Sequence, residues 1–245
     1  MELMGHIENI HQNSRKLYGA PRVTAALENL GHPISRSTVS RWMSEAGLAA
    51  KTQRRYRVVT TDSNHKLPVA ENILDRQFSP AQPGAVLASD ITYIATMEGW
   101  LYLAITLDLF SRRVVGWSLG STMEEKLVLN ALTMALGRTD LQAGAIHHSD
   151  RGSQYAANEF RKLLAAEKLR QSMSRKGNCW DNAPTESFFH TLKTEHIYFE
   201  TYATKEDARK SIFEYIEVFY NRVRLHSTLG YKSPVDFEKE FAKCA

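Results

Sequence analysis

Three carboxylates occur where a negative charge is costly for packing. Asp90 interrupts an apolar stretch, Asp150 follows another, and Glu186 lies in Asn-Ala-Pro-Thr-Glu-Ser-Phe-Phe, with 35 residues between Asp150 and Glu186. If the three side chains converge, their mutual repulsion requires divalent cations, and carboxylate oxygens suit Mg²⁺ or Mn²⁺. Two such ions about 3.5–4 Å apart can assist an in-line displacement at phosphorus. The pattern therefore predicts metal-dependent phosphoryl transfer.

Other interpretations of these residues stay open from the residues alone. Asp108 also lies in an apolar stretch, and periodicity does not rank it below Asp90. His147 and His148 could ligate a metal, but adjacent side chains of a strand point to opposite faces, so at most one would do so. The three acids could also be unrelated, two of them capping loops and one on a helix surface.

Two basic side chains follow Glu186 on the helix that we expect around it. His190 lies four residues and Lys193 seven residues beyond Glu186, so the three share nearly one helix face. A cation there could contact a phosphate bound over the metals. The alternative is an ordinary exposed lysine.

Five strands with interleaved helices are predicted to position these residues. The strands are expected over residues 86–96, 100–110, 112–119, 143–148 and 169–173. A capping box over residues 122–125 predicts the start of one helix, and a second box at Thr204 predicts another. Asn182 is expected to cap the helix of Glu186, with Pro184 in its first turn. The order predicts an α/β fold, a mixed five-stranded sheet flanked by helices.

The N-terminal part of the chain is basic and helical. Residues 11–57 carry nine Lys and Arg against two Glu, whereas the whole chain has a net charge of +4. Two short helices separated by Gly31-His-Pro33, the second capped by Ser35, match a helix-turn-helix. Arg36 and Arg41 on the exposed side of the second helix are candidate DNA contacts. An αα-hairpin that binds nothing would show the same pattern.

A basic cluster follows this helical region. Its candidate DNA-binding residues are Lys51, Arg54, Arg55 and Arg57, with a tyrosine among them. Interleaved Arg and Tyr suit phosphate contact and base stacking. A flexible tether is the alternative interpretation.

Composition restricts the class of protein. The chain has 245 residues, 43% hydrophobic and 24% charged, which is typical of a globular protein. It contains no apolar run long enough for a membrane span and no signal peptide, so no membrane partner is expected. Cys179 and Cys244 lie far apart, which disfavours a disulfide framework and indicates a cytoplasmic location.

Several blocks of sequence resemble one family. The blocks are Asp90-Ile-Thr-Tyr-Ile, Asp108-Leu-Phe-Ser-Arg-Arg-Val-Val-Gly-Trp117, His147-His-Ser-Asp-Arg-Gly-Ser-Gln-Tyr155, Ser172-Met-Ser-Arg-Lys-Gly-Asn178, Asp181-Asn-Ala-Pro-Thr-Glu-Ser-Phe-Phe189, Tyr18-Gly-Ala-Pro-Arg-Val-Thr24 and Tyr220-Asn-Arg-Val-Arg-Leu-His-Ser-Thr-Leu-Gly-Tyr231-Lys-Ser-Pro234. They resemble the second-frame transposases of the third family of bacterial insertion sequences. Those enzymes belong to the retroviral-integrase-like superfamily with an RNase H-like core.

The resemblance implies a site and a reaction. Asp90, Asp150 and Glu186 would be the catalytic triad of a DDE transposase, holding two Mg²⁺ or Mn²⁺ ions, and Asp108 would have a structural role. Lys193 would contact DNA near the cleaved phosphate, and Arg151 is a further candidate DNA contact. The reaction would be nicking at the ends of the element, followed by attack of the freed 3′-hydroxyl on another phosphodiester.

The resemblance also implies partners and an organisation of the chain. The partners would be double-stranded DNA with the terminal inverted repeats of the element, target DNA, a second copy of the chain, and a first-frame protein as partner or frameshift fusion. Relatives usually carry further N-terminal sequence, so we expect a shortened second-frame product. The expected regions are a helix-turn-helix (1–48), a basic Pro-containing linker (49–84), the RNase H-like integrase core (85–200) and a C-terminal helical extension (201–245).

Two rival functions remain from the sequence. A hydrolysing nuclease of the same superfamily would cut DNA without joining it. A non-catalytic DNA-binding protein would occupy the ends of the element and repress its relatives.

Overall fold

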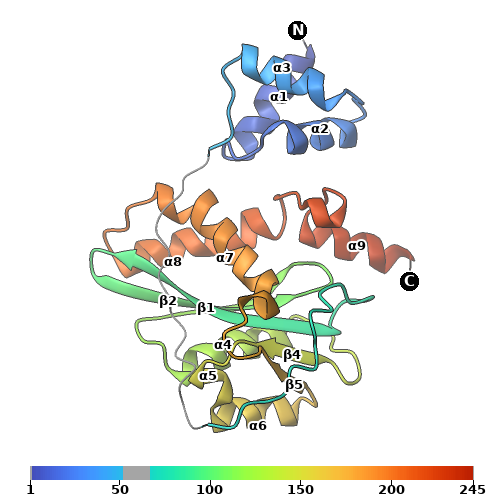
Figure 1. Ribbon diagram of the computed structural model, residues 1–245. Helices are drawn as coiled ribbons and strands as arrows, with labels where there is room; N and C mark the ends of the chain where they lie inside the picture. The colour runs from blue at the N-terminus through green and yellow to red at the C-terminus, as the bar shows by residue number, and fades with distance from the viewer. Residues whose placement is uncertain (1, 52–66, 245) are drawn as a thin grey trace.

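The computed structural model describes residues 2–51 and 67–244 (Figure 1). The N-terminal part contains three helices, α1 (Glu2–Asn13), α2 (Ala20–Asn29) and α3 (Arg36–Glu45). Pro21 lies at the start of α2, and the Ser35 hydroxyl caps α3 by accepting a hydrogen bond from Thr38 N at 3.2 Å. The two predicted helices are confirmed, and α1 packs against them as a third that was not predicted.

A mixed five-stranded sheet forms the centre of the rest of the chain. Its strands are β1 (Val86–Thr96), β2 (Gly99–Asp108), β3 (Val114–Gly120), β4 (Ile146–Ser149) and β5 (Arg170–Met173). Their spatial order is β3-β2-β1-β4-β5. The β1–β2 and β2–β3 pairs are antiparallel, whereas β1–β4 and β4–β5 are parallel. The predicted fold class is therefore confirmed.

Helices cover both faces of the sheet. One face packs on α4 (Glu125–Leu136), α5 (Ser153–Ala156) and α6 (Asn158–Ala166). The other packs on α7 (Ala183–Glu195), α8 (Lys205–Phe213) and the π-helical turns Glu214–Tyr220 that continue α8, with α9 (Pro234–Cys244) beyond them. Figure 1 shows these two layers below and above the strands. Side chains of β1 alternate between these two faces. Leu87 and Ile91 pack in the core under α4, α5 and α6, whereas Val86 and Ala88 pack in the core under α7 and α8.

Short 3-10 helices connect the C-terminal elements. They span Cys179–Asn182, Ile197–Phe199 and Ser227–Leu229.

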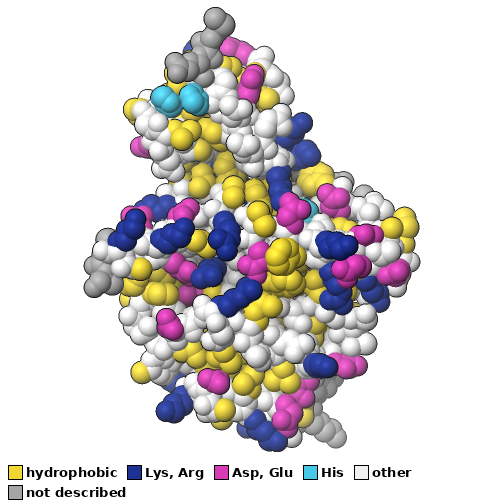
Figure 2. All heavy atoms as spheres, turned by 180° about the vertical axis from the view of Figure 1, so that it is seen from behind, with side chains coloured by type: hydrophobic (Ala, Val, Ile, Leu, Met, Phe, Trp, Pro, Cys, Tyr) yellow, Lys and Arg dark blue, Asp and Glu magenta, His cyan; other side chains and the backbone are white. Residues whose placement is uncertain are grey.

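On the face opposite to that in Figure 1, basic side chains form a band across the middle of the molecule, with acidic ones among them (Figure 2). Within the ranges that the structure describes, no helix is both long and apolar enough to cross a bilayer.

Two predicted helix starts differ from the structure, and a third is confirmed. The capping box over residues 122–125 is wrong, because α4 begins only at Glu125 and the Glu125 carboxylate accepts a hydrogen bond from Phe160 N at 2.9 Å. Asn182 occupies the N-cap position of α7, but in the described part of the chain its Oδ1 atom has no hydrogen-bond partner. The box at Thr204 forms as predicted with Asp207 and starts α8.

The N-terminal helices pack on the C-terminal half of the chain. The Tyr18 hydroxyl donates to Val223 O at 3.1 Å and accepts from Leu225 N at 2.7 Å. Arg22 on α2 forms an ion pair with Glu195 at the end of α7, with 3.3 Å between Nη1 and Oε1. Arg22 thus connects the helix-turn-helix to the helix that carries Glu186, and Tyr18 connects it to the segment of Val223 and Leu225.

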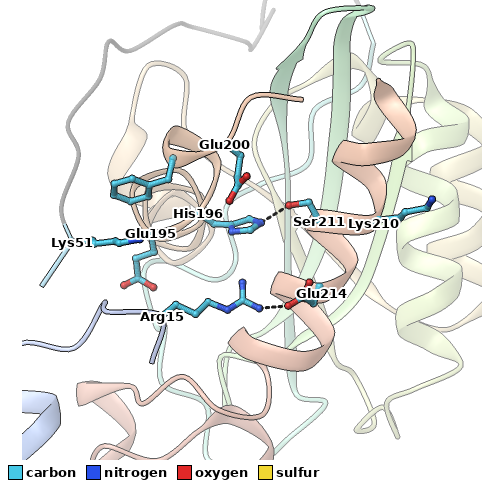
Figure 3. Close-up of a pocket in the computed structure, with 9 residues that line it drawn as sticks. Arg15, Lys51, Glu195, His196, Glu200, Lys210, Ser211 and Glu214 are labelled. Atoms are coloured by element: carbon cyan, nitrogen blue, oxygen red, sulfur yellow. Dashed lines mark hydrogen bonds and ion pairs between the residues drawn. The ribbon is translucent and has the colours of Figure 1, made fainter. Parts of the chain in front are cut away.

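A pocket of about 510 Å³ lies at this junction (Figure 3). Its charged lining residues are three cations and three anions, namely Arg15, Lys51, Lys210, Glu195, Glu200 and Glu214. The Arg15 guanidinium points toward Glu214 and binds its carboxylate at 2.6 Å. Because the opposite charges offset one another, the pocket has no excess of positive charge.

Candidate active site

Asp90 and Asp150 lie side by side because β1 and β4 are parallel and in register. Ser89 of β1 pairs with Ser149 of β4, so the next residue of each strand is a carboxylate. The pairing of β4 covers β1 only as far as Ser89. From Asp90 onward β1 extends past the end of β4, and α7 packs along this part of it.

Helix α7 brings Glu186 to the same place. Glu186 lies in its first turn, and the preceding residue, Thr185, places its Oγ1 atom 3.5 Å from Asp90 Oδ2. Thr185 also donates a shorter hydrogen bond, 2.9 Å long, to Asn182 O. These contacts place the start of α7 against the strand that bears Asp90.

The charges of Asp150 and Glu186 both act on Asp90. Burial raises the pKa of Asp90 well above its ordinary value, and the negative charge of Asp150 and then that of Glu186 raise it further. The Ile91 amide opposes this shift by donating to Asp90 Oδ1 at 2.8 Å. Asp150 Oδ1 accepts a comparable bond from Gly152 N at 2.9 Å. An accumulation of like charge of this kind favours a cation or a proton.

The residues at this position suit a divalent cation by their chemistry. Asp90, Asp150 and Glu186 supply hard oxygen donors, which Mg²⁺ and Mn²⁺ prefer. The buried Tyr155 hydroxyl, whose pKa is raised by burial and then by the charges of Asp90 and Asp150, has no hydrogen-bond partner among the described residues. Within residues 2–51 and 67–244, however, no three His, Cys, Asp or Glu side chains are grouped as a set that could hold a metal ion. The carboxylates are adjacent without forming a closed cage.

Asp108 lies apart from this cluster. Its Oδ1 accepts a hydrogen bond from Phe110 N at 2.8 Å and its Oδ2 one from Gly84 N at 3.3 Å, so it holds the turn after β2. Burial raises the pKa of Asp108 to about 6, although both amides oppose the shift. Asp90, and not Asp108, is therefore the acid that lies beside Asp150.

The two histidines are buried in hydrogen-bonded positions. His147 Nε2 lies 2.8 Å from Ser89 Oγ, and His148 contacts the hydroxyls of Ser172 at 2.9 Å and Ser174 at 3.2 Å. Burial lowers the pKa of His147 to about 3 and that of His148 to about 4. Both rings are therefore neutral near pH 7 and fill structural positions behind the carboxylates.

The basic residues predicted near the triad occupy different positions. Lys193 is half-buried, with its Nζ 4.4 Å from the centroid of the Tyr93 ring, and it interacts electrostatically with Asp90. His190 is exposed on α7. Arg151 donates from Nε to Ser174 O at 2.6 Å, so it braces the loop after β5. A DNA-binding role for each stays a prediction.

The predicted N-terminal DNA contacts lie away from the carboxylates. Arg36 and Arg41 are exposed on α3, as expected, and Arg41 lies 3.9 Å from Glu45. Lys51 is exposed, with its Nζ 5.6 Å from the centroid of the Phe199 ring. The remaining predicted contacts, Arg54, Arg55 and Arg57, lie outside the described residues.

A second charged cluster anchors the segment before α7. The buried Asp181 carboxylate accepts hydrogen bonds from Arg175, Arg76 and Asn72. Arg76 and Asn72 belong to a segment between Leu67 and β1, and its residue Leu74 is buried. The described part of the region expected to be a linker thus contacts the core.

Sequence reasoning did not single out Thr185, Asp181, Tyr155 or Tyr93. Each lies within a block already quoted for the family resemblance. The only sign of their importance in the sequence was that each lies within five residues of Asp90, Asp150 or Glu186. Their contacts could not be predicted, because they arise where segments distant in the sequence pack together.

Comparison with known proteins assigns a class to this fold. A model described as "Integrase core domain" matches residues 80–179, and a second with the same description matches residues 186–241. A model described as "HTH-like domain" matches residues 1–56.

The chain is similar to a simian T-cell lymphotropic virus intasome structure, with a TM-score of 0.55, 14% identity, and coverage of 95% of this chain and 74% of that one. It is also similar to the HTLV-2 integrase catalytic core domain in complex with magnesium, with a TM-score of 0.50, 13% identity, and coverage of 64% of this chain and 98% of that one. The fold is that of an integrase core.

Relatives of higher identity define the family. The Shigella sonnei insertion element IS600 uncharacterized 31 kDa protein is 44% identical over 98% of this chain and 88% of its own length. Transposase InsF for insertion sequence IS3A of Escherichia coli (strain K12) is 45% identical over 93% of this chain and 78% of its own length. The chain belongs to the IS3 family of transposases. The predicted family is therefore confirmed.

Proposed function

We propose that this chain is a DDE transposase that cleaves DNA at the ends of an insertion sequence and transfers the freed 3′-hydroxyl to a second DNA. The observation that supports the proposal is that the charges of Asp150 and Glu186 both act on Asp90, where β1 passes the end of β4. The three would hold two Mg²⁺ or Mn²⁺ ions. When bound, such ions activate an attacking oxygen and stabilise a leaving one.

The reaction consists of two displacements at phosphorus. In the first, a water oxygen attacks a phosphodiester at the end of the element, the P–O3′ bond breaks, and a 3′-hydroxyl and a 5′-phosphate result. In the second, that 3′-hydroxyl attacks a phosphodiester of the target, and the target strand releases its own 3′-hydroxyl. One phosphodiester is formed for each one broken in the second step, so joining needs no external energy source.

The chain's own residues would position the DNA for both displacements. Lys193 lies beside Asp90 and would bind a phosphate adjacent to the reacting one. Thr185 and the Ile91 amide fix the Asp90 carboxylate, and the Gly152 amide fixes that of Asp150. Holding reactants in a fixed geometry of this kind contributes several kcal/mol to catalysis, up to about 7–11 in favourable cases.

The remaining regions would select and assemble the DNA. Residues 1–48 would bind the terminal inverted repeat through exposed groups of α3 such as Arg36 and Arg41. Residues 49–84 would act as a basic connection, and residues 85–200 and 201–245 as the core and its extension. Two ends must meet for transposition, so a dimer on DNA is expected, with a first-frame protein as a further partner or fusion.

An assay with labelled ends distinguishes this function from its rivals. The chain is incubated with Mg²⁺ or Mn²⁺, duplexes that carry the terminal inverted repeat, and an unlabelled target plasmid. A transposase yields nicked ends and products joined to the plasmid. Nicking without joining would indicate a hydrolysing nuclease, and binding without either product would indicate a DNA-binding repressor.

A further inference from the structure

Two aromatic side chains and a lysine form a cluster beside the carboxylates. The rings of Tyr93 on β1 and Trp100 at the start of β2 meet edge to face, with centroids 5.0 Å apart and an interplanar angle of 89°. The Lys193 Nζ lies 4.4 Å from the centroid of the Tyr93 ring. Tyr93 thus lies between a cation from α7 and an indole from the β1–β2 hairpin.

This cluster lies a short way along the same two elements that carry the triad. Tyr93 is three residues beyond Asp90 on β1, about 10 Å along a strand whose side chains alternate between the two faces. Trp100 lies opposite Ala95, which is five residues beyond Asp90 and therefore about 17 Å from it along β1. Lys193 is seven residues beyond Glu186 on α7, which corresponds to about 10 Å. The contacts Thr185–Asp90 and Lys193–Tyr93 show that α7 and β1 run side by side over this distance. At about 3.4 Å per nucleotide along one strand, Tyr93 is about three nucleotides and Trp100 about five nucleotides from the carboxylates.

The exposed indole has the properties of a stacking surface. Trp100 is 51% exposed although it is one of the largest apolar side chains of the protein. Its edge-to-face contact with Tyr93 fixes the orientation of the ring while half of its surface stays accessible. Exposed aromatic rings with cations nearby bind bases and phosphates of single-stranded nucleic acid, and here the Tyr93 ring lies between the Trp100 indole and the Lys193 ammonium group.

We propose that Trp100, supported by Tyr93, stacks on an unpaired nucleobase of the DNA strand whose phosphate lies at the carboxylates. The inference rests on the proposed function, since it takes that strand as the ligand. Lys193 would contact the phosphate between the stacked base and the reacting phosphodiester. Trp100 would hold the end of the DNA open for both displacements.

Fluorescence of a base analogue tests this stacking without requiring catalysis. Duplexes carrying the terminal inverted repeat are made with 2-aminopurine at each of the first eight positions from the cleaved end, and are mixed with the full chain and Mg²⁺. We expect quenching at one position near the fifth nucleotide. Trp100→Ala should abolish that quenching and weaken DNA binding by about 5- to 150-fold, which is the equivalent of about 1–3 kcal/mol.

Two further variants separate stacking from folding. Trp100→Phe keeps an aromatic ring and should retain most of the quenching. Met97→Ala removes a side chain that is 75% exposed on the same hairpin and should leave both quenching and affinity unchanged. The proposal is overturned if Trp100→Ala, with an unchanged melting temperature, quenches and binds like the wild type.

The outcome can be told apart from a failure of the proposed function. If the wild type shows the quenching but neither cleaves nor joins DNA, the stacking site stands and the transposase activity does not. If the wild type cleaves and joins but Trp100→Ala matches it in affinity and quenching, the transposase activity stands and the stacking site does not.

Discussion

The Arg175 side chain donates two hydrogen bonds to Asp181, from Nε to Oδ2 at 2.8 Å and from Nη2 to Oδ1 at 2.9 Å. Arg76 adds a third from Nε at 2.8 Å. These charges hold the pKa of Asp181 well below its ordinary value, so the carboxylate stays ionised at neutral pH. Asp181 precedes Glu186 by five residues and therefore fixes the start of α7 next to the carboxylate cluster.

Removing this anchor should impair catalysis while leaving the triad chemically intact. Asp181→Asn loses the paired charge at a buried position, and we expect DNA joining to fall by about 10²-fold, because a displacement of about 1 Å at a reacting group has that effect. The matched control is Asp75→Asn, which affects the same Arg175 from the surface, where the Asp75 side chain is 68% exposed and the ion pair is 3.2 Å long. The control should retain nearly full activity. Equal rates for the two variants would refute the anchoring role.

Glu195 connects three parts of the chain at the other end of α7. It binds Arg224 through two bonds of 2.7 Å each, Arg22 of the N-terminal helices at 3.3 Å, and the Tyr215 hydroxyl at 3.2 Å. Glu195→Gln leaves the buried Arg224 without its counter-charge, so the free energy of unfolding in urea should fall by about 3–5 kcal/mol.

The exposed pair Arg15–Glu214 is the control for Glu195. The Glu214 side chain is 64% exposed, and Glu214→Gln should change the free energy of unfolding by no more than about 1 kcal/mol. A loss for Glu195→Gln as small as that for Glu214→Gln would show that the buried cluster does not stabilise the fold.

Asp108 should give the protein a measurable pH dependence. Its pKa in the folded state is about 6, against an ordinary value of 3.8, so the folded state binds the proton more tightly than the unfolded state. The stability from this protonation is fully present below about pH 4 and is lost as the pH rises through about 6. Asp108→Asn cannot ionise, so its stability relative to the wild type should rise by about 2 kcal/mol between pH 4 and pH 7. Urea titrations of both proteins across this range measure the difference, and a constant offset would contradict it.

The close approach of α4 to β3 depends on Gly116. A Cβ atom at this position would lie 2.0 Å from Ala131 O and 2.7 Å from Ala135 N, both in the backbone of α4. Gly116→Ala should therefore destabilise the fold by about 1–3 kcal/mol or more, because the helix must move away from the sheet. Gly5 in α1 has open space around its Cβ position, and Gly5→Ala should raise stability by up to about 1 kcal/mol. Melting temperatures of the two variants should shift in opposite directions.

Elements with a strong local pattern were predictable from the sequence. The bounds of β1 agree with the prediction at both ends because its apolar residues end at the turn before Gly99. The cap of α3 at Ser35 and the box of α8 at Thr204 also depend on neighbouring residues alone. The start of α4 was misplaced because the Glu125 side chain binds Phe160 N, which lies 35 residues away.

The candidate site was predictable in residue type but not in arrangement. Periodicity could not separate Asp90 from Asp108, because both lie in apolar strands. The separation comes from the pairing of Ser89 with Ser149, which joins strands that are distant in the sequence. The π-helical turns over Glu214–Tyr220 were also not predictable from local sequence, because their buried side chains pack against α7 and the sheet, which are distant in the sequence.

The central claim is that Asp90, Asp150 and Glu186 form one metal-dependent site in which Asp108 takes no part. Its most direct test is the joining of labelled inverted-repeat DNA to a plasmid in Mn²⁺, with Asp150→Asn and Asp108→Asn compared at equal folded concentration. We predict that Asp150→Asn binds the DNA but gives no joined product, whereas Asp108→Asn joins DNA at a rate close to that of the wild type. Joined product from Asp150→Asn at the wild-type rate, or its complete loss in Asp108→Asn with the fold intact, would contradict the account.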